Sequence, residues 1–207
     1  MKMRSNILYA LTLFLTASFG MLHAQDNNVN TEFGVKGGLN MSNLYTDDAD
    51  DENVLFGFNA GVYATLPVSD FIAIQPELLF TTRGSKLEYN NALAQGNVKL
   101  KLNYIELPLL VRVNITKNFN IHAGGYASYM VSAKSTGDGD FEFEDQYNTD
   151  DFNKFDAGLA GGIGVDFSPL SVGLRYNYGL TTIEKDGDDS SDLKNSNLSL
   201  YLSYKLN

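Results

Sequence analysis

The segment FGFNAGVYATL, residues 56–66, decides how this chain folds. Apolar residues fall at every second position, and polar or small residues occupy the positions between them. The apolar set is Phe56, Phe58, Ala60, Val62, Ala64 and Leu66, and the other set is Gly57, Asn59, Gly61, Tyr63 and Thr65. A side-chain period of two belongs to a β-strand whose two faces meet different surroundings. The segment therefore predicts a strand with one apolar and one polar face.

The same alternation recurs in further segments on both sides of this one. They cover residues 33–42, 72–83, 105–114, 119–131, 155–167, 170–181 and 197–206. With residues 56–66 they predict eight strands, each long enough for the roughly 9–11 residues that cross a bilayer at a tilt. Leu100 and Leu102 break the pattern, because they are out of phase with the apolar positions of residues 105–113. We expect a β-bulge near Tyr104, or a strand that extends beyond the membrane there.

The connections between these segments alternate in length as regularly as the strands follow one another. Short turns are predicted at residues 67–70, 116–118 and 168–169, and long polar segments at residues 45–55, 90–98, 134–154 and 184–194. An even number of strands with short turns at one rim and long loops at the other is typical of outer-membrane barrels. In such barrels the short turns and both termini face the periplasm.

The orientation of the two faces separates a membrane barrel from a soluble one, since a soluble eight-stranded carrier of an apolar ligand alternates in the same way. Charged residues gather in the loops, and aromatic residues sit near the strand ends, where membrane barrels place interfacial girdles. These aromatic residues are Phe119, Phe167 and Tyr204 near the short turns, and Phe56, Phe80, Phe155 and Tyr178 nearer the loops. We therefore expect an all-β, eight-stranded antiparallel up-and-down transmembrane β-barrel, with the soluble periplasmic carrier as the alternative.

The first residues resemble a secretory signal. Lys2 and Arg4 precede an apolar stretch over residues 7–22, and Ala24 offers a small residue for cleavage. We expect a signal peptide at residues 1–24 and one barrel domain at residues 25–207, located in a bacterial outer membrane. The chain has no Cys, which excludes disulfides and thiolate metal sites. Its formal net charge of −10 argues against nucleic acid as a partner.

An eight-stranded barrel is just wide enough for its inward side chains to fill it. The charged residues expected inside form a polar network of Lys36, Glu77, Arg83, Glu106, Arg112, His122 and Arg175. The residue numbers of Glu77 and Arg112 have the same sum as those of Arg83 and Glu106. One antiparallel register would therefore place both pairs face to face, and we expect two interior salt bridges across this seam.

Small residues are expected to face the interior between residues 158 and 164. They are Gly158, Ala160, Gly162 and Gly164. Narrow barrels are filled by small side chains next to large ones. We therefore expect this stretch to leave room for Tyr126 and Arg175 on the neighbouring strands.

Acidic residues crowd three of the long loops. Carboxylates on loops can hold Ca²⁺, or bridge through divalent ions to lipopolysaccharide phosphates. The candidates for a metal site are Asp138, Asp140, Asp186 and Asp188. Solvation, with mutual repulsion that keeps the loops open, explains the same composition without a metal.

Residues 25–207 contain one His, His122, and no Gly-rich phosphate loop. A lone inward His is poorly placed to activate a nucleophile, so we expect no catalytic residue and no cofactor. The expected function is a non-enzymatic monomeric barrel that contacts outer-membrane lipid, lipopolysaccharide or a protein partner through its loops, or supports envelope integrity. A narrow channel or an accessory component of a protein-export apparatus is the alternative.

Five segments resemble the PorT-like, or porin-family, outer-membrane β-barrel proteins. They are FGVKGGLNMSNL at residues 33–44, IQPELLFTTRG at 74–84, YIELPLLV at 104–111, AGLAGGIGVDF at 157–167 and LRYNYGLTTI at 174–183. The resemblance runs in order along nearly the whole of residues 25–207 and implies an outer-membrane barrel. The member that names the family is associated with secretion of proteins across the outer membrane, so the resemblance also implies export as a candidate role.

Overall fold

A computed structural model describes residues 31–45, 54–91, 94–139, 143–147, 153–182 and 194–207. Nearly all of these residues lie in antiparallel β-strands. The strands are β1 (Glu32–Tyr45), β2 (Leu55–Pro67), β3 (Ile72–Asn91), β4 (Ala94–Asn114), β5 (Phe119–Gly139), β6 (Phe143–Tyr147), β7 (Phe155–Phe167), β8 (Leu170–Thr182) and β9 (Lys194–Lys205). None of the described residues forms a helix long and apolar enough to cross a bilayer.

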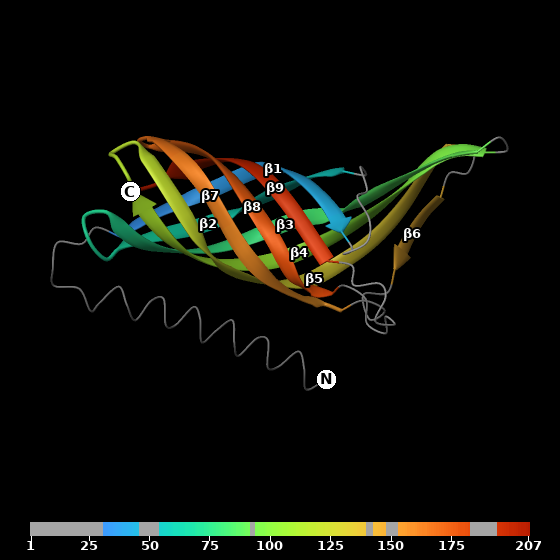
Figure 1. Cartoon of the computed structure of the whole chain (residues 1–207), viewed down its shortest axis with the longest axis horizontal. Coiled ribbons are helices and arrows are strands. Elements are labelled where there is room, and N and C mark those ends of the chain that lie inside the picture. Colours follow the sequence, from blue (N-terminus) through green and yellow to red (C-terminus); the bar gives the residue numbers. More distant parts are fainter. Residues whose placement is uncertain (1–30, 46–53, 92–93, 140–142, 148–152, 183–193) are drawn as a thin grey trace. The chain divides into compact units, whose positions relative to one another are not determined.

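Eight of these strands close into a barrel (Figure 1). Each pairs with its neighbours in chain order, and β1 pairs with β9 to complete the circle. The short strand β6 pairs only with the end of β5, so it lies outside the ring. The prediction of an eight-stranded antiparallel up-and-down barrel is confirmed.

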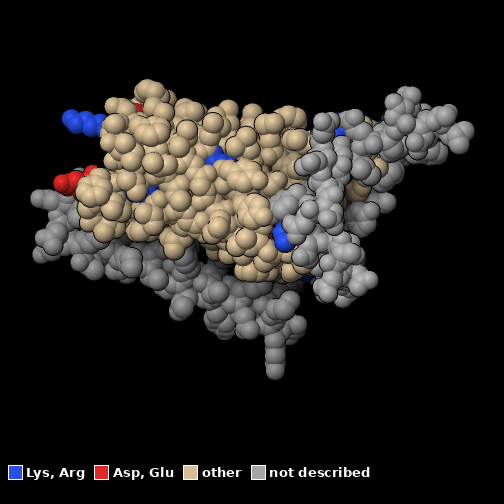
Figure 2. Space-filling view, viewed as in Figure 1, with Lys and Arg blue, Asp and Glu red and all other residues tan. Residues whose placement is uncertain are grey.

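The barrel turns its apolar face outward. Most of the flank in Figure 2 carries few charged residues, and outward side chains such as Leu39, Leu109 and Leu159 are more than half exposed. The inward positions of the same strands hold buried polar groups such as Asn40 and Glu77. A soluble carrier has the opposite arrangement, so the alternative of a soluble carrier is wrong.

The small inward residues of β7 make room for large neighbours. Gly158 lies opposite Tyr126 of β5, and a Cβ on Gly158 would lie 2.7 Å from Cε1 of the Tyr126 ring. Gly162 lies opposite Arg175 of β8, and a Cβ there would lie 3.0 Å from the Arg175 Cα. The predicted packing of Tyr126 and Arg175 against this strand is confirmed.

The variant Gly158→Ala should destabilise the barrel by about 1–3 kcal/mol, because the added methyl overlaps both the Tyr126 ring and the backbone oxygen of Tyr178. Gly161→Ala on the same strand is the matched control, since a Cβ there meets nothing within 4 Å. Urea unfolding in lipid vesicles measures both. Equal stability of the two variants would show that Gly158 is not needed for this packing.

The pairing of β3 with β4 differs from the predicted register. Arg112 lies opposite Ala73 and not Glu77, a displacement of four residues along β3. The pairing keeps the same register to Asn91 and Ala94, which leaves only two residues between the strands. This tight connection fixes the register, whereas the sequence had indicated a long loop over residues 90–98. The predicted register is therefore wrong.

The strands β3, β4 and β5 continue well past the end of the barrel on the loop side, the end opposite the short turns. With β6 they form what we call the extension sheet: residues 85–91, 94–101, 132–139 and 143–147 (Figure 1). Much of the predicted loops at 90–98 and 134–154 is therefore strand. The β4–β5 register slips between Asn103 and Tyr104, where Val131 of β5 is the extra residue. This bulge lies on β5 and does not change the phase of β4, so the second alternative holds: β4 extends beyond the end of the barrel.

Leu100 and Leu102 keep the phase of β4 and point toward the interior side. Leu102 is fully buried in a cluster with Tyr104, Met130 and Ala133, and Leu100 packs against this cluster. The sequence phase changes here because the apolar positions of β4 move from the outward to the inward face, and not because the strand itself is broken.

Candidate functional site

A central cluster of charges crosses the middle of the barrel. Glu77 of β3 accepts hydrogen bonds from Lys36 Nζ of β1 at 2.6 Å and from both terminal nitrogens of Arg175 of β8 at 2.7 and 2.9 Å. Gln75 Nε2 donates to the same carboxylate at 2.6 Å. The Lys36, Glu77 and Arg175 side chains are at most 4 % exposed. We refer to these three residues as the central cluster.

His122 of β5 lies beside the central cluster. Arg175 Nε donates to His122 Nε2 at 3.3 Å, so Nδ1 carries the ring proton and lies 3.2 Å from Asn120 Oδ1. The Tyr201 ring is close by, with its centroid 4.1 Å from Lys36 Nζ. Both nitrogens of His122 are engaged, which leaves neither available as a base for a nucleophile.

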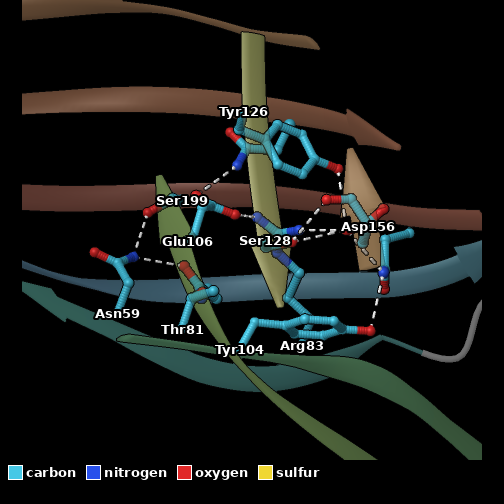
Figure 3. A network of polar contacts seen from close by, with 12 residues as sticks. Asn59, Thr81, Arg83, Tyr104, Glu106, Tyr126, Ser128, Asp156 and Ser199 are labelled. Carbon is cyan, nitrogen blue, oxygen red and sulfur yellow. Dashed lines mark hydrogen bonds and ion pairs between the residues drawn. The ribbon is translucent and has the colours of Figure 1, made fainter. Parts of the chain in front are cut away.

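A second group of charges, the loop-side cluster, consists of Arg83, Glu106 and Asp156 (Figure 3). Arg83 is fully buried, donates to Glu106 through Nη2 and lies 3.1 Å from Asp156 Oδ2 through Nη1. Its guanidinium carbon sits 4.8 Å from the centroid of the Tyr126 ring. The expected ion pair of Arg83 with Glu106 forms although Arg83 lies opposite Leu102, because the long side chain reaches along the tilted strands.

Asp156 also accepts hydrogen bonds from uncharged groups. Asn195 Nδ2 lies 3.2 Å from Oδ2, and the hydroxyls of Tyr126 and Ser128 lie 3.4 Å from the same oxygen. Thr181 Oγ1 donates to Oδ1 at 2.9 Å. In contrast, Glu106 receives only one further contact from a neutral side chain among the described residues, from Asn177 Nδ2 at 3.2 Å.

Arg112 belongs to a third pair, at the short-turn side. Its Nη2 lies 2.6 Å from Asp166 Oδ2 of β7, and Asn120 and Ser171 donate to the same carboxylate. The predicted salt bridge between Glu77 and Arg112 is therefore absent from the described residues, and that prediction is wrong. β5 pairs with β4 on one side and with β7 on the other, so Asp166 of β7 lies within reach of Arg112 across β5.

Asp156 and Asp166 fall on the same face of residues 155–167 as Gly158 and Gly162, but the alternation does not assign them partners. Their partners Arg83 and Arg112 lie 73 and 54 residues away along the chain. Alternation identifies inward positions, but it does not say which strands face each other across the lumen.

The two buried clusters carry opposite excess charge. The central cluster sets two cations against one carboxylate, and the loop-side cluster sets two carboxylates against one cation. Between them lies a cavity of about 10 Å³, lined in part by Arg175, Glu106, Asn177 and Asn197. This volume corresponds to about one water molecule. The lumen is therefore filled at this level.

A wider hollow of about 330 Å³ lies at the short-turn side. Its wall includes Glu32, Arg112, Asp166 and Lys205. Lys205 Nζ lies 2.9 Å from Glu32 Oε1, and both side chains are about a third exposed. This polar hollow leads toward the filled part of the lumen.

The candidate Ca²⁺ ligands cannot be placed. Asp140, Asp186 and Asp188 lie outside the described residues, and Asp138 is described only through its backbone in β5. Among the described residues, no three His, Asp or Glu side chains gather as a metal site would require.

Two solved structures of bacterial proteins are similar to this chain. Neisserial surface protein A matches with a TM-score of 0.51 and 15 % identity, over 86 % of this chain and 99 % of that one. Ail, the attachment invasion locus protein of Yersinia pestis, matches with a TM-score of 0.48 and 12 % identity, over 86 % and 99 %. Its structure was solved in complex with the heparin analogue sucrose octasulfate. At these identities the likeness concerns the fold alone.

The sequence itself matches no curated protein. Residues 23–184 match the family described as outer membrane protein beta-barrel domain, which is most of the chain. The outward apolar face and the closed ring of eight strands agree with this match. The chain thus belongs to the outer membrane protein beta-barrel domain family and is a transmembrane β-barrel of the bacterial outer membrane.

Proposed function

We propose that this protein is a non-enzymatic barrel, closed to solutes, that anchors an external surface in the outer membrane. This surface consists of the extension sheet and the acidic loops predicted within residues 45–55, 134–154 and 184–194. It contacts envelope lipid or a protein partner. The observation that carries the proposal is the filled lumen, where the central and loop-side clusters leave a cavity of only about 10 Å³ between them. Such a barrel holds its external surface in the membrane and does not conduct solutes through its lumen.

The closed lumen follows from the energetics of the central cluster. A hydrated ion passing the barrel would have to separate Glu77 from Lys36 and Arg175. Each of these groups is buried, and leaving a buried charge without its partner costs several kcal/mol. The three side chains therefore stay paired, and the paired side chains block the lumen.

The absence of catalysis is part of the proposal and is supported by the geometry of His122, whose two ring nitrogens are held by Arg175 and Asn120. The barrel is proposed to act as a monomer, because each of its eight ring strands pairs with a ring neighbour on both sides in the described residues. Only the extension sheet, outside the ring, ends in edge strands, β3 and β6. The PorT-like resemblance of residues 74–84 and 104–111 makes an accessory role in protein export the finer alternative.

Single-channel recording in planar bilayers tests the closed lumen. The wild-type barrel should show no conductance steps above the bilayer background. The double variant K36A/E77A should show small steps, because it empties space in the central cluster and removes one charge of each sign. Regular steps from the wild-type protein would overturn the proposal in favour of a narrow channel.

A further inference from the structure

The outward side chains of β4 change from apolar to cationic toward the loop side. From the short-turn side its outward residues are apolar up to Leu107 and Ile105. Beyond the register slip at Asn103 they become Lys101 and Lys99, while the inward positions become Leu102 and Leu100. An outward face that turns from apolar to cationic has left the hydrocarbon region.

The two neighbouring strands change at the same level. On β3 the outward Phe80 lies opposite Ile105, and Lys86 follows six residues later. On β5 the exposed Val131 is followed by Lys134. Cationic side chains therefore begin just beyond the apolar band on three adjacent strands.

These lysines share one face of the extension sheet. Lys86 lies directly opposite Lys99, and Lys101 lies directly opposite Lys134. Lys99 and Lys101 are two residues apart on β4, so all four point the same way. We call Lys86, Lys99, Lys101 and Lys134 the lysine face.

Such an arrangement favours an anion. Directly opposite residues in an antiparallel pair have Cβ atoms about 4.5–5.5 Å apart, and like charges there are destabilising. Lys86, Lys99 and Lys134 also take part in interactions within the chain, with which an incoming anion would compete. A phosphate between the two cross-strand pairs would bring one anionic group within reach of all four lysines.

The distance between the lysine face and the apolar band, measured along the barrel axis, indicates which kind of anion the lysines meet. Lys101 lies four residues beyond Ile105, which is ~10 Å along the barrel axis for a strand tilted by about 40°. The headgroup regions add roughly 5–8 Å on each side of the hydrocarbon core, and a lysine side chain can bend back toward them. The ammonium groups of Lys101 and of Lys134 opposite it therefore reach the level of the lipid phosphates, and Lys86 and Lys99 lie two residues farther out.

We propose that the lysine face binds the phosphate groups of a phosphorylated glycolipid of the outer leaflet, of the lipid A type. The loop side faces the cell exterior in barrels of this design, so the lysine face lies against the outer leaflet. A soluble polyanion is less favoured, because the face continues the lipid-facing wall directly above its apolar band. The proposal rests on the proposed role of the extension sheet as a surface that contacts the envelope, and it does not depend on whether the lumen is closed.

Binding of diphosphoryl lipid A to the full chain in detergent micelles, followed by native mass spectrometry, tests this proposal. The variant K99Q/K101Q should bind on the order of tenfold more weakly, since each basic residue near an anionic surface strengthens binding several-fold. The control K117Q/K205Q removes two lysines from the short-turn side and should bind as the wild type does. Added NaCl should weaken wild-type binding.

Three results would overturn the proposal. The first is equal lipid A binding by K99Q/K101Q and K117Q/K205Q, and the second is equal wild-type binding of fully dephosphorylated lipid A. The third is lysine-dependent binding of a soluble sulfated polysaccharide without lysine-dependent lipid A binding, which would assign the face to a soluble partner. A heat-dependent gel shift reports folding of each variant. If K99Q/K101Q does not fold, K86Q/K134Q tests the same face from the two outer strands.

Discussion

Glu77→Gln should destabilise the barrel by about 3–5 kcal/mol, the usual cost of removing one partner from a buried ion pair. The side chain is fully buried and accepts hydrogen bonds from Lys36 and Arg175. Glutamine keeps the size of the side chain but removes its charge, so two buried cations lose their carboxylate at once. Few single changes in the described residues leave so much charge unbalanced.

Urea unfolding in lipid vesicles gives the measurement. Glu32→Gln serves as the matched control, because it makes the same chemical change in the partly exposed pair with Lys205. Exposed pairs contribute about 0–1 kcal/mol, so the control should stay close to the wild type. A loss for Glu77→Gln no larger than that for Glu32→Gln would show that the central cluster does not stabilise the barrel.

The double variant K36M/E77Q separates charge from packing. Removing Lys36 together with the Glu77 charge leaves Arg175 as the remaining cation of the cluster, still in contact with His122. Its stability should therefore lie between those of Glu77→Gln and the wild type. No recovery at all would point to lost packing around residue 77, and not to the unpaired cations, as the cause.

The fold could be predicted from the sequence because a period of two is a local property. Residues 56–66 show it without reference to any other strand, and each further strand repeats it. The charge partners could not be predicted in the same way. Glu77 and Arg175 are 98 residues apart, and only closure of the ring through β1 and β9 brings their strands face to face.

The register of β3 and β4 shows a second limit. The residue numbers of the two expected charge pairs have the same sum, which predicts one register for the two strands. The pairing that runs on to Asn91 and Ala94 imposes another register. The polar composition of residues 90–98 predicts a loop. In the extension sheet, however, polarity of the outward face marks the exit from the membrane and not the end of the strand.

Arg83→Met should also destabilise the barrel by about 3–5 kcal/mol. Here the unpaired charges are carboxylates, whereas in Glu77→Gln they are cations. Arg83 is the one cation that contacts both Glu106 and Asp156 in the described residues, and it is fully buried. Methionine fills similar space without charge, so two carboxylates lose their cation. Arg112→Met is the matched control, since Arg112 is partly exposed and its partner Asp166 keeps hydrogen bonds from Asn120 and Ser171.

The two carboxylates should not contribute equally to this loss. Asp156 retains donors from Asn195, Thr181 and two other hydroxyls when Arg83 is gone, whereas Glu106 retains Asn177. A carboxylate with several donors is stabilised without a cation, so R83M/E106Q should recover more stability than R83M/D156N. The same urea unfolding experiment ranks the two double variants. Equal recovery would mean that the neutral donors around Asp156 do not sustain its charge, and the cation alone would then hold the loop-side cluster together.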